Sequence, residues 1–474
     1  MKIIHFTAEC YPVAKVGGLG DVLGALPKYL NQAGEDTSVV MPCYETKFVL
    51  EKTWDEVYEG TVKLAQAFYT FKILKESTDV LGFPLYVVRI PGLIEGPAVY
   101  TGMFDTERFT GFQLAALQWI QSMETLPDVL HCHDHHSGLV PFLIQYAHGF
   151  EKLRNVAAVF TIHNGLYQGQ FAWSKSNILP SYDSWKWGML DWDGFINPMA
   201  SAIKCSWKFS TVSQGYMEEL RTEAAGLESL IRMEWAKAAG IVNGIDTDVW
   251  NPATDTNLEV TYAADDAEEG KRANKEALCK SFNLDASRPL ISFIGRLVHE
   301  KGADLLAESI YKCIQDTEGK VNFLVLGSGA SDIEEALKNL KHFAGSNFNC
   351  YIGYNEKLSH LIYAGSDFLL MPSRMEPCGL NQLYALKYGT VPMVRSTGGL
   401  KDTVTDLGEE GGFGLRFNFA TVNDIGISVR RALMLWEDAE KLAAVRKHMM
   451  QIDHSWEHSA AKYIELYKSL KKHD

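Results

Sequence analysis

The sequence predicts an α/β protein with two domains, each built on a doubly wound parallel sheet. Short β-branched and apolar runs alternate with longer segments of helical period along nearly all of the 474 residues, which is typical of parallel α/β architecture. This series starts again after a polar, acidic stretch over residues 251–280, whose composition suits a surface connection. We therefore expect domains over residues 1–244 and 245–455, and a helical segment over 456–474 is a candidate to cross back to the first domain.

The strands can be placed along the chain. Those of the first domain are Lys2 to Phe6, Thr37 to Met41, Leu85 to Ile90, Val129 to Cys132, Ala157 to Thr161, Phe209 to Val212 and Gly240 to Val242. Those of the second are Pro289 to Ile294, Val321 to Leu326, Asn349 to Ile352, Phe368 to Met371 and Val391 to Val394. Doubly wound sheets bind ligands beyond the carboxyl ends of their strands. Two such sheets facing each other would form a cleft between the domains, lined by the residues that follow the strands.

Composition excludes several classes of protein. Hydrophobic residues at 46% and charged residues at 22% argue against disordered and disulfide-scaffold chains. The net charge of −14 argues against nucleic acid or an anionic membrane as a partner, because both are bound through clustered Lys and Arg. The eight cysteines have no zinc-ligand spacing and indicate reduced thiols. With a strand-like N-terminus and no apolar run of about 18 residues, we expect a cytoplasmic protein.

A glycine-rich loop follows the first strand. It contains Lys15, Gly17, Gly18 and Gly20, and a helix is expected to begin near Asp21. Such a loop lets backbone N–H groups and a helix N-terminus approach a phosphate. The spacing fits neither established glycine-rich phosphate motif, so a tight turn is an equal alternative, and Lys15 favours anion binding.

Two histidine-containing segments follow neighbouring strands. The run HCHDHH at 131–136 narrowly misses a metallo-hydrolase pattern, because Asp134 stands one place early. A zinc site is the less favoured interpretation. We instead expect Asp134 to hydrogen-bond a polar substrate and His131 to be a satisfied core histidine. His163 and Asn164 follow the next strand, so they are expected to converge with Asp134.

The second half places charged groups after strands. Arg296 and Lys301 in GRLVHEKG could clamp a pyrophosphate, since Arg offers a forked donor and Lys a point charge. Glu376 lies in a Pro-bounded loop before a helix, where a carboxylate could accept sugar hydroxyls or merely favour the helix N-terminus by about 0.3–1 kcal/mol.

Further candidates lie in the same half. Thr397, Gly398 and Gly399 form another strand-to-helix turn, and Tyr354 could stack on a base. The DxD strings at 191–193 and 246–248 match the metal-binding pairs of some glycosyltransferases. The first lies in a Trp-rich loop and the second in the presumed connector, so neither is a convincing metal site.

Long motifs make the sequence recognisable. They are KVGGLGDV (15–22), HDHHSGL (133–139), FTIHNGLYQGQF (160–171), TVSQGY (211–216), NGIDTDVWNP (243–252), GRLVHEKG (295–302), PSRMEPCGLNQLYALKYGTVP (372–392) and STGGLKDTV (396–404). In this order they resemble the bacterial glycogen synthase and plant starch synthase family. The resemblance implies a GT-B fold with two Rossmann-like domains. It also implies a retaining transfer of glucose from a nucleotide donor, usually ADP-glucose, to the non-reducing end of an α-1,4-glucan.

The same resemblance implies roles for individual residues. The implied catalytic set is Lys15, Asp134, His163, Arg296, Lys301 and Glu376. The implied donor-binding set is Lys15, Gly17, Gly18, Asp21, Asn243, Arg296, Lys301, Tyr354, Cys378, Gly379, Thr397, Gly398 and Gly399. The acceptor side would hold Asp134, His163 and Asn164. With cations placed at the departing diphosphate, no metal and no cofactor is expected.

Some features depart from related enzymes or leave alternatives open. Tyr384 stands where E-x7-E transferases have a second glutamate, and segments 93–109 and 196–207 differ from the family pattern, so no contact is assigned there. The alternatives are a related GT-B transferase that uses UDP-glucose or another acceptor, and a non-catalytic glucan-binding protein. A covalent carboxylate intermediate and a same-face attack, which we favour, both retain configuration. Donor preference, glucan length, processivity and oligomeric state stay open.

Overall fold

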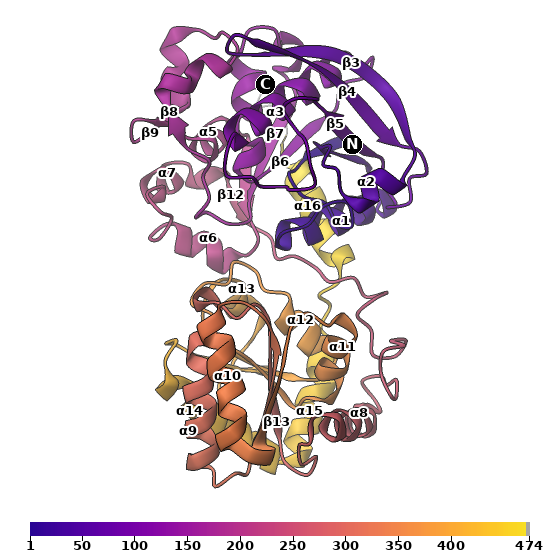
Figure 1. Cartoon of the computed structure of the whole chain (residues 1–474), viewed down its shortest axis with the longest axis vertical. Helices are drawn as coiled ribbons and strands as arrows, with labels where there is room; N and C mark the ends of the chain where they lie inside the picture. Colours follow the sequence, from indigo (N-terminus) through magenta and orange to yellow (C-terminus); the bar gives the residue numbers. More distant parts are fainter. Residues whose placement is uncertain (471–474) are drawn as a thin grey trace. The chain divides into compact units, whose positions relative to one another are not determined.

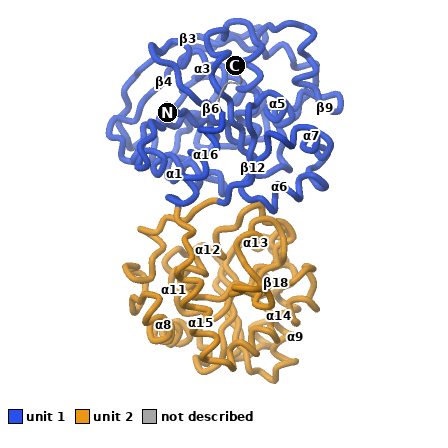
Figure 2. Tube along the Cα trace, turned by 180° about the vertical axis from the view of Figure 1, so that it is seen from behind, with its two compact units in different colours: residues 1–242, 456–474 blue, residues 243–455 orange. Residues whose placement is uncertain are grey.

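The computed structural model describes residues 1–470, which form two compact units. Unit 1 comprises Met1–Val242 and the C-terminal segment that starts at Trp456, and unit 2 comprises Asn243–Ser455 (Figures 1 and 2). The sequence analysis set the boundary two residues later, after residue 244. Asn243 belongs to unit 2, and its backbone N–H contacts the thiol of Cys378 in the same unit. The last four residues of the expected C-terminal segment, 471–474, lie outside the described part of the chain.

Unit 1 is built on a sheet of nine strands in the order β12-β11-β7-β6-β1-β2-β5-β4-β3. Their bounds are β1 Lys2–Phe6, β2 Asp36–Pro42, β3 Trp54–Leu64, β4 Ala67–Glu76, β5 Leu85–Arg89, β6 Val129–His133, β7 Ala157–Ile162, β11 Lys208–Thr211 and β12 Ala238–Gly240. The strands from β12 to β5 are parallel. The chain leaves β1 toward β2 and later returns to its other side with β6, so the topological switch lies between β1 and β6.

The far edge of this sheet differs from the all-parallel expectation. β3 and β4 form an antiparallel hairpin with a register shift between Glu56 and Tyr58, and β4 pairs antiparallel with β5. The sequence analysis missed this hairpin because β3 leaves most of its side chains exposed, so its sequence lacks the apolar run of a buried strand. The last strand of unit 1 was expected at 240–242, whereas the observed β12 begins two residues earlier, at Ala238.

The helices of unit 1 cover this sheet and end with the C-terminal segment. They are α1 Gly18–Gln32, α2 Lys47–Glu51, α3 Asp105–Gln121, α4 Val140–Tyr146, α5 Pro198–Cys205, α6 Gln214–Leu220, α7 Glu228–Met233 and α16 Trp456–Lys468. A small antiparallel sheet of β8 Phe171–Ala172, β10 Phe195–Ile196 and β9 Asp191–Trp192 lies beside them. α16 packs against α1 (Figure 1), and its buried aromatic residues Trp456, Tyr463 and Tyr467 account for the helical spacing of that segment.

Unit 2 has a fully parallel six-stranded sheet in the order β15-β14-β13-β16-β17-β18. Its strands are β13 Leu290–Ile294, β14 Asn322–Gly327, β15 Phe348–Ile352, β16 Phe368–Met371, β17 Val391–Arg395 and β18 Leu415–Phe417, of which only the short β18 was missed. Its helices are α8 Ala267–Phe282, α9 Leu306–Asp316, α10 Ser331–Ala344, α11 Glu356–Gly365, α12 Asn381–Lys387, α13 Gly398–Thr403, α14 Val422–Glu437 and α15 Ala439–Met450. The topological switch lies between β13 and β16.

Two further features bear on the sequence predictions. All eight cysteines are buried and unpaired with one another. Among residues 1–470, no helix is long and apolar enough to cross a bilayer.

Candidate functional site

The predicted site residues follow strands that flank the two topological switches or lie next to those strands. In unit 1 the glycine loop follows β1, Asp134 follows β6 and His163 follows β7. In unit 2 Lys301 follows β13, Glu376 follows β16 and the Thr397–Gly399 turn follows β17. Because carboxyl ends of parallel strands meet at one edge of a sheet, each unit gathers its own set of polar groups there.

The glycine loop of unit 1 is organised by Glu9. Its buried carboxylate accepts the backbone N–H groups of Val16 at 2.6 Å and Gly17 at 2.9 Å, and the hydroxyl of Tyr100 at 2.5 Å. Beyond this turn, Lys15 Nζ lies 2.7 Å from Asp21 Oδ1. The loop thus presents a partly exposed cation at the start of α1, where the helix dipole also favours anions.

Gly17 and Gly18 stand at the first positions of this helix. A Cβ at either would meet no heavy atom within 4 Å, so the space beside their backbone is open. The N–H of Gly17 is already bonded to Glu9, so this open space favours close approach of an anion at Gly18.

Asp134 and His163 are joined through the backbone. Asp134 Oδ1 accepts the N–H of His163 at 2.7 Å and that of Asn164 at 3.4 Å. Burial raises the pKa of Asp134 to about 7, against these two hydrogen bonds, which lower it. Asp134 also combines a φ of 57° with a ψ of 178°, a strained conformation of a kind that clusters at functional sites. The three acceptor-side residues of the sequence prediction therefore form one hydrogen-bonded group.

A cluster of histidines lies behind His163. His5, His131 and His133 are buried, and one nitrogen of each lies within 4.8 Å of the others. Both nitrogens of His131 are hydrogen-bonded, to Tyr467 Oη at 2.7 Å and to Thr161 Oγ1 at 2.7 Å. Both nitrogens of His133 are also engaged, by His5 and His163. These bonds satisfy the rings of His131 and His133 without a metal.

In unit 2, Lys301 and Glu376 form a bidentate ion pair. Lys301 Nζ lies 2.7 Å from both Glu376 Oε1 and Oε2, and Ser373 Oγ donates to Oε2 at 2.9 Å. The Glu376 side chain is only 9% exposed and that of Lys301 is 22% exposed. The pair is therefore largely desolvated, which strengthens its interaction with any charge that approaches.

The Thr397–Gly399 turn packs against the segment that carries Glu376. Gly399 N donates to Glu376 O at 3.1 Å. A Cβ at Gly398 would lie 2.1 Å from Glu376 O, and a Cβ at Gly399 would lie 2.0 Å from Cys378 O. Glycine is therefore required at both positions by close approach of the backbone.

Further predicted residues belong to unit 2. Arg296 is 66% exposed and lies 3.8 Å from Glu300, and within residues 1–470 no hydrogen bond or ion pair joins it to Lys301 or Glu376. Tyr354 is 84% exposed, with its hydroxyl 3.3 Å from Glu356 Oε2. Gly379 adopts a φ of 75°. Cys378 is buried beside Asn243, and burial raises its pKa to about 12, so this thiol is not a nucleophile at neutral pH.

Comparison with known proteins now adds to this geometry. Residues 2–233 match the family model of the starch synthase catalytic domain, and residues 274–445 match that of group 1 glycosyl transferases. The chain is 49% identical over 467 residues to a glycogen synthase of Flavobacterium johnsoniae, covering 98% of both chains. The chain belongs to the glycogen synthase family. As a member of this family, it is a glycosyltransferase.

Other members of the glycogen synthase family are more distant. A glycogen synthase of Streptococcus sanguinis is 36% identical over 487 residues, covering 99% of this chain and 100% of the relative. The catalytic domain of starch synthase IV from Arabidopsis thaliana, solved with ADP and acarbose, superposes with a TM-score of 0.86 at 32% identity, covering 99% of both chains. The fold is that of GT-B glycosyltransferases, as the sequence predicts.

Sequence reasoning missed three residues that make hydrogen bonds to the segments carrying the predicted site residues. Glu9 organises the glycine loop. Ser373 binds Glu376, and Arg395 donates to the backbone oxygens of Ser373 at 2.7 Å and Arg374 at 2.6 Å. Arg395 directly precedes the motif STGGLKDTV, and Glu9 lies six residues before KVGGLGDV, so nearness to a motif was the available signal. Their partners are distant in sequence and could not be identified from it.

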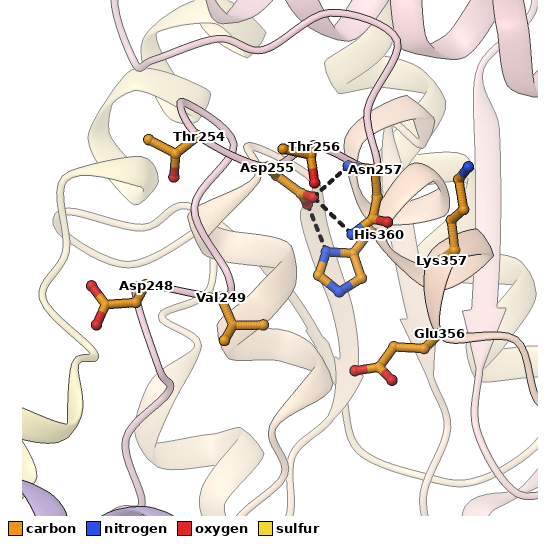
Figure 3. A pocket seen from close by; sticks show the side chains of 9 residues that line it. All are labelled: Asp248, Val249, Thr254, Asp255, Thr256, Asn257, Glu356, Lys357 and His360. Atoms are coloured by element: carbon orange, nitrogen blue, oxygen red, sulfur yellow. Dashed lines mark hydrogen bonds and ion pairs between the residues drawn. The ribbon is translucent and has the colours of Figure 1, made fainter. Parts of the chain in front are cut away.

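The two DxD strings have structural roles in this glycogen synthase family member. Asp191 Oδ1 accepts the indole N–H of Trp173 at 2.7 Å, and Asp246 Oδ1 accepts the N–H of Asp248 at 3.0 Å. Asp248 also lines a polar pocket of about 450 Å³ in unit 2, with Asp255 and His360 at its wall (Figure 3). This pocket contains none of the predicted site residues.

Proposed function

We propose that this chain transfers glucose from ADP-glucose to the non-reducing end of an α-1,4-glucan, with release of ADP and retention of configuration. The observation that carries the proposal is the buried Lys301–Glu376 ion pair at the carboxyl ends of β13 and β16. Such a pair offers one cation for a phosphate and one carboxylate for sugar hydroxyls. ADP and acarbose in the related starch synthase structure support a nucleotide and a glucan-like ligand for this chain.

The chemistry of the reaction explains why cations are needed. Breaking the bond between the anomeric carbon and the diphosphate leaves negative charge on the phosphate and positive charge on the sugar. Fixed positive groups aimed at the growing charge lower the barrier, and loss of one such group typically costs a factor of about 10² to 10³ in rate. We assign this role to Lys301 and Arg296 of unit 2 and to Lys15 of unit 1, so the proposal uses no metal.

The donor glucose would be held by Glu376 and by the turn at Thr397 to Gly399. Glu376 already accepts a hydroxyl hydrogen from Ser373, so its oxygens can accept from the hydroxyls of a sugar in the same way. The Gly17–Gly18 backbone would face the diphosphate, and Tyr354, exposed on the loop after β15, would stack on the adenine. Asp21, Asn243, Cys378 and Gly379 complete the proposed donor set.

The acceptor side is assigned to unit 1. Asp134, His163 and Asn164 form one hydrogen-bonded group there, and a neutral glucan is compatible with a protein of net charge −14. For the retaining step we favour same-face attack, in which the leaving phosphate takes the acceptor proton. We also propose that the protein is cytoplasmic, which the eight buried, unpaired thiols support.

A donor assay tests the proposal. Purified protein is mixed with maltooligosaccharide and either ADP-glucose or UDP-glucose, with and without EDTA, and release of ADP or UDP is measured. We expect ADP release with ADP-glucose, little effect of EDTA and an α-configured product. Absence of nucleotide release from both donors would contradict the proposal. Faster release of UDP than of ADP would identify UDP-glucose as the donor. Lys301→Ala serves as the inactive control. Lys320→Ala, which removes an exposed lysine of unit 2, serves as the matched variant that should keep its activity.

A further inference from the structure

Three histidines of unit 1 form a continuous hydrogen-bonded chain that ends at His163. His5 Nδ1 lies 2.9 Å from His133 Nε2, and His133 Nδ1 lies 3.0 Å from His163 Nε2. His5 and His133 come from the neighbouring strands β1 and β6, and His163 follows β7. The chain therefore runs across the sheet to its carboxyl edge, and no role in the site has been assigned to His5 or His133 above.

Each of these rings carries a single proton. Burial lowers the pKa of His5 and of His163 to about 3, and lowers the pKa of His133 well below its usual value. All three are neutral at pH 7, so in each ring one nitrogen donates and the other accepts. A chain of such rings has only two arrangements of its protons, one the reverse of the other.

The inner end of the chain distinguishes the two arrangements. His5 Nε2 is buried and has no hydrogen-bond partner among residues 1–470. In one arrangement this nitrogen is a bare acceptor, and in the other it is an N–H donor without an acceptor. Among backbone groups, buried N–H donors without an acceptor are rarer than buried acceptors without a donor, and we apply the same order to the imidazole nitrogen. The arrangement with a bare His5 Nε2 is therefore the more stable.

We infer that His5 and His133 are positioning residues that hold His163 as the Nδ1–H tautomer. His5 Nδ1–H donates to His133 Nε2, and His133 Nδ1–H donates to His163 Nε2. His163 Nδ1, which has no partner among residues 1–470, then carries the proton. His163 is half-buried, so this nitrogen is the one that can donate a hydrogen bond to an oxygen of a bound sugar or phosphate.

His131 fixes the planes of the inner rings. Its ring stacks on His133 at a centroid distance of 4.2 Å and makes a tilted contact with the ring of His5 at 4.9 Å. Its own nitrogens are occupied by Tyr467 and Thr161, so it does not compete for the protons of the chain. The chain also ends inside the protein at His5, so it sets a tautomer and does not conduct protons to solvent.

The role of His163 toward substrate rests on the proposed function, but its tautomer does not. NMR of the full-length protein labelled with ¹⁵N-histidine shows which nitrogen of each ring carries the proton. The signals of His163 are identified by their loss in the variant His163→Gln. We expect Nδ1 of His163 to be protonated in the ligand-free protein. A protonated Nε2, or zinc bound stoichiometrically to the purified protein, would overturn the inference, whether or not the protein releases ADP.

Two substitutions at His133 test the positioning role. In His133→Gln the amide can accept from His5 and donate to His163, so the Nδ1–H tautomer should persist. In His133→Leu no donor faces His163 Nε2, so a mixture of tautomers is expected. The kcat/KM of the Leu variant should fall about tenfold relative to the Gln variant, as for loss of one ordinary hydrogen bond.

The control is His136→Leu. His136 is buried in the same segment and stacks on Tyr100 at 5.0 Å, outside the histidine chain, so this variant should leave the tautomer of His163 unchanged. An unchanged tautomer in His133→Leu would overturn the positioning role. If that variant does not fold, the wild-type measurement and His133→Gln still decide the inference.

Discussion

Lys301 Nζ is equidistant, at 2.7 Å, from the two carboxylate oxygens of Glu376. The ammonium group can direct at most three hydrogens, and two of them are used by this carboxylate. A diphosphate that binds Lys301 would therefore share the cation with Glu376. Glu376 in turn holds the ammonium group in place while no substrate is bound.

Removing the charge of Glu376 should reduce both the rate of catalysis and the stability of the fold. Glu376→Gln keeps an acceptor for Ser373 Oγ but leaves Lys301, 22% exposed, without its counter-charge. We expect kcat to fall by a factor of about 10² or more, and the free energy of unfolding to fall by about 1–3 kcal/mol. Initial rates of ADP release and urea denaturation measure these effects. The control is Glu318→Gln, at an 85% exposed acid of unit 2, and equal activity of the two variants would contradict the assignment.

A methyl group at Gly398 should displace Glu376. The added Cβ in Gly398→Ala would lie 2.1 Å from Glu376 O, so the backbone that carries this carboxylate has to shift. Gly411→Ala is the matched control, since Gly411 also has a positive φ, 71°, but open space around it. We expect a loss of activity of about 10²-fold for the first variant, because misplacement by about 1 Å can cost that much, and nearly full activity for the second. If both variants lost activity equally, the loss would come from strain of the backbone at a positive φ and not from displacement of Glu376.

Asp134 should give the enzyme a pH dependence near neutrality. Burial raises its pKa to about 7, so it ionises as the pH rises from 6 to 8. If the carboxylate form serves the reaction, kcat/KM should rise over this range, and the rise should be absent in Asp134→Asn. A pH–rate profile of both proteins checks this. An identical profile in the variant would assign the limb to another group.

The raised pKa of Asp134 should also lower the stability of the folded protein as the pH rises. The folded protein holds the Asp134 proton more tightly than the unfolded chain, whose aspartate titrates near 3.9. The contribution of this group to stability is therefore present below about pH 4 and is lost as the pH rises toward 7. Relative to wild type, Asp134→Asn should become more stable between pH 4 and 7, which denaturant titrations at several pH values can measure.

Tyr354 should affect binding of the donor and not stability. Its side chain is 84% exposed, so Tyr354→Ala removes little packing. Loss of stacking on a base costs about 1–3 kcal/mol, which predicts at least a fivefold rise in KM for ADP-glucose with little change in kcat. Tyr311→Ala, at an exposed tyrosine of α9, is the control. An unchanged KM would place the adenine elsewhere.

The eight thiols should be unreactive in the folded protein. All are buried, and burial raises the pKa of Cys279 to about 11 and that of Cys205 and Cys313 to about 12. Because the thiolate is the nucleophile, we expect no modification by iodoacetamide at pH 7.5 until denaturant is added, measured by intact mass. Rapid modification of any one cysteine without denaturant would identify a segment that opens in solution.

The sequence predicted the parts of the fold whose signal is local. The buried parallel strand Phe368 to Met371 is a continuous apolar run, and Lys2 to Phe6 is apolar apart from Lys2 and His5. Both were placed with their observed bounds. The β3–β4 hairpin was missed, because strands that face solvent on one side carry polar residues that look like loop. The short β18 was missed because three residues give no period.

In the candidate site, too, residues with a local signal could be predicted, whereas contacts between distant residues could not. Arg296, Lys301 and Glu376 could be named because each follows a strand and belongs to a recognisable motif. The bidentate geometry between Lys301 and Glu376 could not be predicted, since it joins residues 75 positions apart. The chain from His5 through His133 to His163 is a further example, because only the order of β1, β6 and β7 in the sheet brings these rings together.

The return of α16 to unit 1 has a consequence for how the protein is made. Unit 2 is a single stretch of chain, Asn243–Ser455, whereas unit 1 needs residues from both ends of the sequence. During translation, every residue of unit 2 therefore leaves the ribosome before unit 1 has its last helix. Until then His131 lacks the hydroxyl of Tyr467, its partner at 2.7 Å, and the face of α1 that α16 covers stays open to solvent or to a chaperone. Nascent chains that stop before Trp456 should thus hold a finished second unit and an unfinished first one.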